Sequence, residues 1–463
     1  MKTSGALGIV LHTHMPYVEG FGTWPFGEEW LWEAIATSYL PLADRVLGRA
    51  PITLSLTPVL CDQLEAPGAM ERCVRFLREI RPESHARDIA SLRDTDGGQG
   101  LVAELERSEA EYAEAADGLE RIGGGLLARL GEHASWTSSA THAVLALIAT
   151  DSGLALQLRT GIESHRRRFG EWGGGFWLPE CAYAPWLDVP LEEAGVRSSC
   201  IELTGRFGLG DERHLRPMQT QDGPLLWPID RATIALVWSE TGYPSRGAYR
   251  NYHRMTEHHH RVWSVDDRPY DHARALAQAR DDARDFVARV RRRVANGGVC
   301  VFALDTELLG HWWYEGVHWL AAVIEEADLQ GLALTDLDDA RERYAADPAP
   351  NDLGVSSWGE GGDLRTWSGP ASADLAWLAR SAELDLLRHA GLRSGVSDRA
   401  LRELLALQAS DWAFLQTRDL AGPYPRERAE GHLTDLRRAL ARGDDSPGPA
   451  LRNLAPDLAG WEG

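Results

Sequence analysis

The chain has 463 residues, a formal net charge of −21, 44% hydrophobic residues and 25% charged residues. That composition can bury a large core, which excludes wholesale disorder. An acidic body repels nucleic acid and anionic lipid, which argues against partners that present phosphate groups.

Short apolar runs along the chain predict β-strands. In chain order they cover residues 7–14, 52–57, 175–180, 199–203, 233–238, 299–304 and 331–335. The apolar part of the first run is too short for a signal-peptide core and is broken by His12, and no run reaches the length of a membrane span. The five cysteines form no C-x-x-C pair, which is typical of buried thiols in a reducing compartment. We therefore expect a cytoplasmic protein, and its oligomeric state stays open.

Amphipathic helical patterns lie between several of these runs, for example at 155–169 and 271–294. Strands that alternate with helices over more than half of a chain predict an α/β fold with a parallel sheet. The first strand ends in HTHMP rather than in a glycine-rich phosphate loop. We therefore expect a barrel and not an open, doubly wound sheet.

Two regions depart from this alternation. Residues 62–130 are acidic and have a helical pattern, and from residue 372 onward leucines and alanines follow helical spacing with no further strand. We predict a catalytic barrel formed by residues 1–61 and 131–370, a helical insertion at 62–130, and a C-terminal all-helical domain at 371–463.

Reactive side chains stand where three of the predicted strands end. The first strand ends in His12 and His14, the third in Glu180, and the sixth is followed by Asp305 and Glu307. Because barrel enzymes place their chemistry at the carboxyl ends of strands, two carboxylates with histidines beside them suit glycoside cleavage. A loop glutamate, a helix-capping aspartate and a His-x-His metal pair without a third ligand are the alternatives. These residues alone leave other barrel chemistries open.

Six ordered motifs resemble those of glycoside hydrolase family 57, and in particular its α-1,4-glucan branching members. They are HTHMPYV at 12–18, WTSSATH at 136–142, WLPECAY at 177–183, LDTELLGHWWYEG at 304–316, SSWGEGGD at 356–363 and QASDW at 408–412. The resemblance implies a distorted (β/α)7 barrel with a helical insertion and a C-terminal helical domain. It implies an enzyme that acts on α-glucan with retention of configuration and without a metal or another cofactor.

The resemblance also assigns roles to individual residues. Glu180 matches the nucleophile that forms a glycosyl-enzyme, and Asp305 matches the general acid/base. Retention requires two carboxyl groups about 5–5.5 Å apart, close enough for like charge to raise the pKa of the acid. The other matched residues are His12, His14 and His142 at the −1 subsite, Trp32, Trp263, Trp358 and Trp367 around the acceptor groove, and Asp411 from the helical domain; Glu307 and His311 are assigned to orienting these groups.

Two stretches depart from the family pattern. Residues 134–136 lack the glutamate that commonly precedes the Thr-Ser pair, and residues 204–214 lack the tyrosine carried by the mobile loop of branching members. Phe207 offers a ring there without a hydroxyl. The main hypothesis is transfer from α-1,4 to α-1,6 linkage in glycogen biosynthesis. The alternatives are an α-glucan hydrolase or 4-α-glucanotransferase, a metal-dependent polysaccharide deacetylase using the His12/His14 pair, and a non-catalytic glucan-binding protein.

Overall fold

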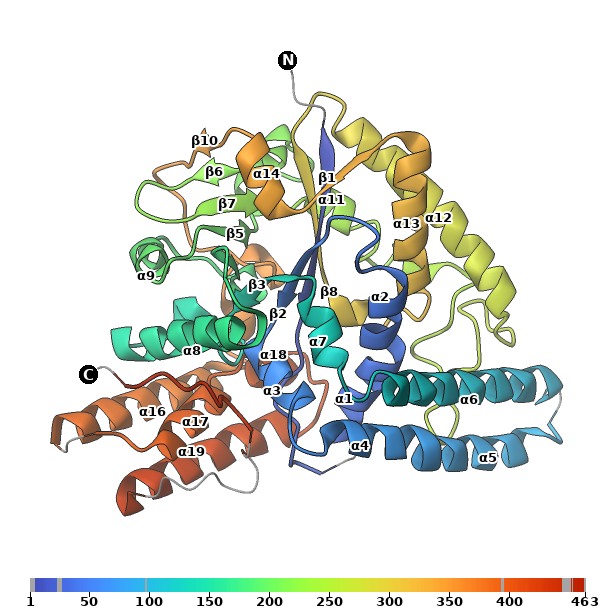
Figure 1. Ribbon diagram of the computed structural model, residues 1–463, viewed down its shortest axis with the longest axis horizontal. Helices are drawn as coiled ribbons and strands as arrows, with labels where there is room; N and C mark the ends of the chain where they lie inside the picture. The colour runs from blue at the N-terminus through green and yellow to red at the C-terminus, as the bar shows by residue number, and fades with distance from the viewer. Residues whose placement is uncertain are drawn as a thin grey trace.

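The computed structural model describes residues 5–22, 27–95, 98–392, 395–443, 451 and 453–461. Its centre is one curled sheet in the order β10-β6-β7-β5-β4-β3-β2-β1-β8, with β9 paired to β1 (Figure 1). The strands are β1 (Ala6–Thr13), β2 (Thr53–Leu56), β3 (Ala134–Ser138), β4 (Gly175–Trp177), β5 (Ser198–Ile201), β6 (Met218–Gln219), β7 (Leu225–Pro228), β8 (Val299–Asp305), β9 (Ala333–Thr335) and β10 (Asp347–Pro348). Every ladder is parallel except β6 with β7.

A single bridge turns this sheet into a distorted barrel. Ile229, directly after β7, pairs in parallel with Val301 of β8, so β7 and β8 meet at the open side of the curl. The strands β1 to β5, β7 and β8 thus form an irregular ring, as the sequence predicts for a distorted (β/α)7 barrel. β1 is buried at every position and lies between β2 and β8, which explains its continuous apolar sequence.

Helices cover the outside of the barrel. They are α8 (Asp151–Phe169), α9 (Asp188–Glu193), α11 (Arg231–Ile234), α12 (His272–Arg293), α13 (Gly316–Gln330) and α14 (Leu337–Arg343). The short helices α10 (Thr204–Phe207) and α15 (Arg365–Ser368) instead carry residues that line a cavity of the barrel. The helices α1 (Glu28–Ala34), the π-helical turn η1 (Ile35–Tyr39) and α2 (Leu40–Arg45) run on without a break, and α2 packs against α13. The helical predictions at 155–169 and 271–294 are confirmed by α8 and α12.

Most of the predicted strands are confirmed, but the run at 233–238 is not a strand. It begins inside α11, where the Asp230 side chain accepts a hydrogen bond from the backbone N–H of Thr233 and caps the helix. The β-branched residues of this run suggested a strand, and the capping aspartate overrides that preference. The two-residue strands β6 and β10 were not predicted, nor were β3 and β7. β3 has the polar sequence ASWTS and β7 the short sequence LLWP, and neither has a run of apolar residues long enough to stand out.

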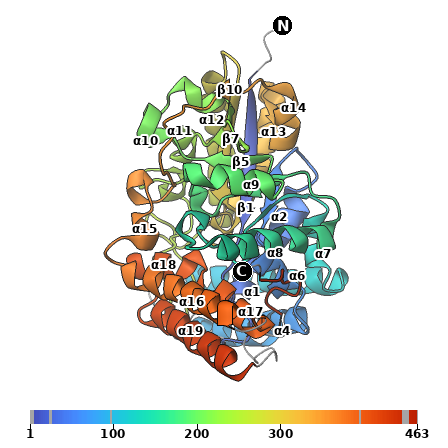
Figure 2. The same ribbon diagram turned by 90° about the vertical axis from the view of Figure 1, so that its left-hand side faces the viewer.

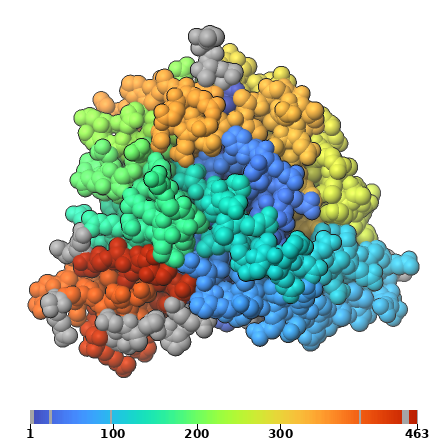
Figure 3. Space-filling model, in the orientation of Figure 1, coloured from blue at the N-terminus to red at the C-terminus, as the bar shows by residue number. Residues whose placement is uncertain are grey.

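Two groups of helices lie below the barrel in Figure 1. The first contains α3 (Pro58–Leu64), α4 (Ala69–Arg75), the π-helical turn η2 (Phe76–Ile80), α5 (Arg81–Leu92), α6 (Gly98–Arg121) and α7 (Leu126–Gly131). The second contains α16 (Ala373–Leu392), α17 (Asp398–Leu407), α18 (Ser410–Thr417) and α19 (Tyr424–Arg442), which share an apolar core. Figure 2 shows this second group beneath α8, and Figure 3 shows the two groups in the lower corners of the molecule.

All five cysteines are buried and unpaired, as predicted. Within the part of the chain that the structure describes, no helix is both long and apolar enough to cross a membrane.

Candidate active site

A cavity of about 1380 Å³ opens at the carboxyl ends of the strands. Glu180 after β4 and Asp305 at the end of β8 both line it, together with His14 after β1. Asp411 of α18 reaches the same cavity from the C-terminal helices. The strand register contributes to this arrangement, because His12 of β1 lies opposite Asp305 of β8. The fold thus brings together residues that are far apart in the sequence.

The carboxylate of Glu180 is held by two hydrogen bonds. The indole Nε1–H of Trp358 donates to Oε2 over 2.8 Å, and the hydroxyl of Ser410 donates to Oε1 over 2.9 Å. The backbone of Glu180 is left-handed, with φ 64° and ψ 19°, a conformation that costs about 1–3 kcal/mol and is concentrated at functional sites. Burial raises the pKa of Glu180, while the two hydrogen bonds oppose that change. The group is fixed in place as a hydrogen-bond acceptor.

Asp305 has different surroundings. Its side chain faces the open cavity and accepts no hydrogen bond from any residue that the structure describes. Burial within the walls of the cavity raises its pKa well above the ordinary value, and the charges of Glu180, Glu307 and Asp411 raise it further. The sequence prediction that like charge would raise this pKa holds in direction, although burial is the larger cause. Of the two carboxyl groups, Asp305 therefore has the stronger preference for the protonated form.

Three histidines stack next to the carboxylates. Nε2 of His12 lies 2.8 Å from Nε2 of His142, and the rings of His14 and His142 are 4.0 Å apart. Burial lowers the pKa of His12 and of His142 well below the ordinary value. Burial also opposes the charged form of His14, but the charge and the hydrogen bond of Asp411, 3.0 Å away, outweigh it and raise the pKa. His14 and His142 line the cavity, and His12 lies behind them on the ring of Trp177.

One ligand atom from each of His14, His142 and Asp411 lies within 4.8 Å of the other two. Of the His-x-His pair, this group contains only His14, and His142 and Asp411 are its other two candidate ligands. However, Nε2 of His14 is already bonded to Asp411, and both nitrogens of His142 are engaged, one with His12 and one with Ser410. A metal ion would have to break these bonds, so the donor set in this arrangement does not fit a metal site.

The two residues predicted to orient the site lie in different places. Glu307 is buried beside the cavity, where Oε1 accepts hydrogen bonds from the Tyr39 hydroxyl over 2.6 Å and from the His14 backbone N–H over 3.1 Å. Burial raises the pKa of Glu307 to about 7, against the effect of the Tyr39 hydrogen bond. His311 does not line this cavity and belongs to a neighbouring one. Tyr39 was not predicted, because it is an ordinary aromatic residue of a helical segment.

Some of the predicted tryptophans line the first cavity, and others lie away from it. Trp358 and Trp367 line the cavity, whereas Trp32 and Trp263 do not. Trp32 is buried against Phe76 in the main core, and Trp263 packs with the apolar residues of α6. Trp30 lines the cavity instead. Residues two apart on a helix point in nearly opposite directions, so only one of this pair can face the cavity, and the sequence did not show which one.

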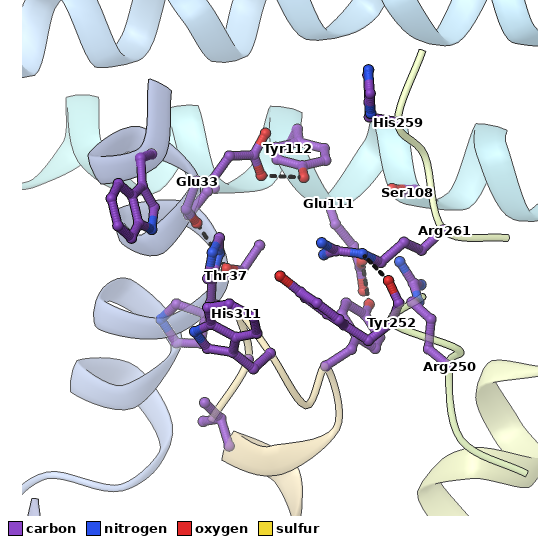
Figure 4. A pocket seen from close by; sticks show the side chains of 18 of the residues that line it. Glu33, Thr37, Ser108, Glu111, Tyr112, Arg250, Tyr252, His259, Arg261 and His311 are labelled. Carbon is purple, nitrogen blue, oxygen red and sulfur yellow. Dashed lines mark hydrogen bonds between the residues drawn. The ribbon is translucent and has the colours of Figure 1, made fainter. Parts of the chain in front are cut away.

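A second cavity of about 770 Å³ adjoins the first and shares with it Trp30, Trp312, Asp411, Phe414 and Leu420. It lies between α6, the π-helical turn η1 and the loop at 250–261 (Figure 4). Tyr252 extends from that loop toward His311, with its ring 4.7 Å from that of Trp312 and the guanidinium of Arg261 over its face at 3.9 Å. Glu33 accepts a hydrogen bond from the Tyr112 hydroxyl over 2.6 Å. Aromatic faces and hydrogen-bonding groups thus line a path that leads away from the carboxylates.

The chain is similar to known enzymes along nearly its whole length. The family description Glycosyl hydrolase family 57 matches residues 131–346, and the description 1,4-alpha-glucan branching enzyme, C-terminal matches residues 375–446. A probable 1,4-alpha-glucan branching enzyme of Mycobacterium tuberculosis is 32% identical, in an alignment that covers 99% of this chain and 95% of the relative. The chain belongs to glycosyl hydrolase family 57. The family predicted from the six motifs is therefore confirmed.

Solved structures of family 57 agree with this assignment. The branching enzyme of this type from Pyrococcus horikoshii has a TM-score of 0.86 and 28% identity, covering 97% of this chain and 94% of that one. The branching enzyme of Thermococcus kodakaraensis, solved in complex with glucose, also has a TM-score of 0.86 and 28% identity, covering 98% of this chain and 95% of that one. The likeness extends over the barrel and the C-terminal helices together.

The stretch at 204–214, where branching members of family 57 carry a tyrosine, forms α10 and the turn that follows it. Thr204, Gly205 and Arg206 line the first cavity, but Phe207 does not. The ring of Phe207 instead packs under the guanidinium of Arg213, at 4.0 Å. Phe207 therefore does not place its ring where it could substitute for the missing tyrosine.

Proposed function

We propose that this protein is a 1,4-alpha-glucan branching enzyme that acts in the cytoplasm and forms α-1,6 branches during glycogen biosynthesis. The names of its full-length relatives and of its similar solved structures support this proposal. The five buried free thiols are compatible with a reducing compartment. In the proposed division of the chain, residues 1–61 and 131–370 form the barrel, 62–130 an insertion, and 371–463 the domain that brings Asp411 to the cavity.

The contrast between the two carboxyl groups is the observation that carries the proposal. Glu180 is oriented by two donors, as a nucleophile requires, and Asp305 faces open space with a raised pKa, as an acid requires. Two carboxyl groups whose surroundings separate their pKa values are typical of acid and nucleophile pairs. We assign Glu180 as the nucleophile and Asp305 as the general acid/base.

In the first step, a carboxylate oxygen of Glu180 attacks the anomeric carbon of an α-1,4 linkage. Asp305 gives its proton to the oxygen that leaves, so the glycosidic bond breaks as the glycosyl ester forms. In the second step, Asp305 takes a proton from the 6-hydroxyl of an acceptor glucan. That oxygen attacks the same carbon and releases Glu180. Each step inverts the configuration, so the product keeps the α configuration.

The charge of the neighbouring residues suits these two reaction steps. The protonated form of His14, favoured by Asp411, adds positive charge near Glu180. The second cavity, which joins the first through Trp30 and Trp312, offers room for a second glucan chain beside the reacting one. Aromatic side chains along this path would bind sugar faces and keep water away from the glycosyl ester.

The test is to incubate amylose with the wild type, Glu180→Gln and Asp305→Asn. We expect the wild type to produce new short chains that appear only after enzymatic debranching, because branches carry their segments on α-1,6 bonds. Each variant should lose at least about 100-fold in rate, since each removes a group that bonds to or exchanges a proton with the substrate.

Glu163→Gln is the matched control, because Glu163 is exposed on α8 and pairs with Arg166 of the same helix. It should keep the wild-type rate. Early release of reducing sugar without debranchable chains would show hydrolysis and overturn the branching proposal. Full activity in Glu180→Gln would overturn the assignment of the nucleophile.

A further inference from the structure

The hydroxyl of Ser410 lies between two groups of the active site. It is 2.9 Å from Oε1 of Glu180 and 2.9 Å from Nδ1 of His142. Ser410 is the first residue of α18 and is buried. A hydroxyl has a single proton to donate, so Ser410 can donate to only one of these two neighbours and must accept from the other.

The charge of Glu180 decides the direction. A charged carboxylate can only accept, so Ser410 donates to Glu180 and accepts from Nδ1–H of His142. His142 is neutral because it is buried, and its Nε2 then accepts from Nε2–H of His12, 2.8 Å away. Nδ1 of His12 in turn accepts from the hydroxyl of Ser55 over 3.3 Å. These four bonds, which we call the serine–histidine chain, all point toward Glu180.

The hydrogen bonds of the serine–histidine chain can also all point in the reverse direction. The hydroxyl of Ser55 has a second acceptor, the carbonyl of Thr137, at 3.5 Å. If Ser55 donated there, each histidine would change its tautomer and Ser410 would donate to His142. Glu180 could then keep its bond to Ser410 only by carrying a proton. One direction of the serine–histidine chain therefore suits a charged Glu180, and the other suits a protonated one.

We propose that Ser410 is a positioning residue for the nucleophile, and that through it the serine–histidine chain holds Glu180 in its charged form and aimed at the sugar. The inference rests on the proposed function, in which Glu180 attacks as a carboxylate. It gives the C-terminal helices a second task beside the contribution of Asp411, since the donor comes from α18 and not from the barrel.

Other titratable groups face Glu180 from the surrounding elements and act on it in both variants and wild type. They are His14 beyond β1, His142 after β3, Cys181 in the same turn, Asp305 of β8 and Asp411 of α18, and Glu202 after β5 lines the same cavity. The backbone of Ser410 is held independently of its side chain. Its N–H donates to the carbonyl of His142 over 3.2 Å, and Ala143 and Ala409 form a β-bridge beside it. Truncation of the hydroxyl should therefore leave α18 in place.

The experiment is to measure kcat and KM on amylose as a function of pH for Ser410→Ala. Loss of one hydrogen bond to a charged group should move the acid limb of kcat/KM upward by about one pH unit and lower kcat roughly tenfold at neutral pH. KM should change less than about twofold, because the hydroxyl contacts the nucleophile and not the sugar. Ser410→Thr keeps the hydroxyl and should restore the wild-type acid limb.

Two further variants distinguish an effect of the serine–histidine chain from a local effect of removing a hydroxyl. Ser55→Ala, which does not touch Glu180, should move the acid limb in the same direction by a smaller amount. Ser139→Ala removes another buried hydroxyl from the loop of His142, one that donates to the Ala143 carbonyl, and should behave as the wild type. An unchanged acid limb in Ser410→Ala or in Ser55→Ala would overturn the proposal, as would an equal shift in Ser139→Ala. Failure of the proposed function would show differently, as activity that survives in Glu180→Gln.

Discussion

Glu180 and Asp305 carry the same chemical group, and their neighbours make them different. Glu180 receives donors from Trp358 and Ser410, whereas Asp305 receives none from the described residues and faces the charges of Glu180, Glu307 and Asp411. A carboxyl group such as that of Asp305, which has no hydrogen-bond donor in the described part of the chain and lies near other negative charges, destabilises the folded protein when it ionises. Active sites commonly carry such a cost in stability in exchange for function.

Because ionised Asp305 destabilises the fold, we predict that a neutral side chain at this position stabilises the protein. In the unfolded chain an aspartate titrates near its ordinary value of about 3.9, and in the folded protein the pKa of Asp305 is raised well above its ordinary value. Above the unfolded value, ionisation therefore favours unfolding, and the folded protein gains stability as pH falls toward it. Asp305→Asn removes the penalty, so at pH 7 it should melt about 1–3 °C above the wild type, with the difference vanishing near pH 3.

Melting curves of both proteins from pH 3 to pH 8 check this expectation. Asp281→Asn is the control, because Asp281 is an exposed residue of α12 that pairs with Arg284. It should show no such pH-dependent gain. A lower melting temperature for Asp305→Asn at pH 7 would contradict the proposed electrostatics of the site.

At the scale of elements, α8 holds the loop that carries His142. The carbonyl of Gln157 on α8 accepts from the Ala140 N–H over 3.1 Å, and the Gln157 side chain accepts from the Thr141 N–H over 3.2 Å. The helix lies very close to the end of β3, where Gly161 leaves no room for a side chain. A Cβ at that position would come within 2.3 Å of the Ser138 carbonyl oxygen.

Gly161→Ala should therefore push α8 away from β3 and destabilise the protein by about 1–3 kcal/mol, which is typical of overpacking. Gly431→Ala is the matched control in the middle of α19, where an added Cβ meets no atom within 4 Å. It should stabilise the protein by about 0.5–1 kcal/mol, the difference in helix propensity. Urea unfolding midpoints compare the two, and equal effects of the same sign would refute the close contact at Gly161.

At the scale of the whole molecule, the C-terminal helices are joined to the barrel by buried polar contacts. Arg428 of α19 donates to the carbonyl of Tyr17, which follows β1, over 2.8 Å, and its guanidinium lies 3.3 Å from the ring centre of Phe21. Since Ser410 and Asp411 belong to the same group of helices, this junction keeps α18 next to Glu180 and His14.

Arg428→Met should lower the free energy of unfolding by about 1–3 kcal/mol, because it leaves buried acceptors without their donor. Activity should fall as well, as α18 loses its support. Arg426→Met on the same helix removes an exposed ion pair with Asp374 and should cost less than about 1 kcal/mol. Thermal unfolding and limited proteolysis of both variants check the difference. Equal melting temperatures would show that Arg428 does not join the two parts.

The sequence by itself determined most of the strands and placed the candidate reactive residues at their ends. Its apolar runs predicted β1, β2, β4, β5, β8 and β9, and the polar residues at the ends of β1, β4 and β8 gave His12, His14, Glu180 and Asp305. Such signals are local, since a strand that is buried on both faces requires apolar side chains at consecutive positions. The polar strand β3 and the capped helix at 231–234 lacked them.

Only the tertiary structure decided which side chains meet. It shows that Trp30 lines the first cavity and Trp32 does not, and that His311 lines the second cavity. It also shows that Ser410 and Tyr39 form hydrogen bonds with the carboxyl groups of the site. It also supplied Asp411 as the partner of His14, across 397 positions of sequence. Contacts of that kind depend on how the C-terminal helices dock onto the barrel, and no local pattern records the docking of distant segments.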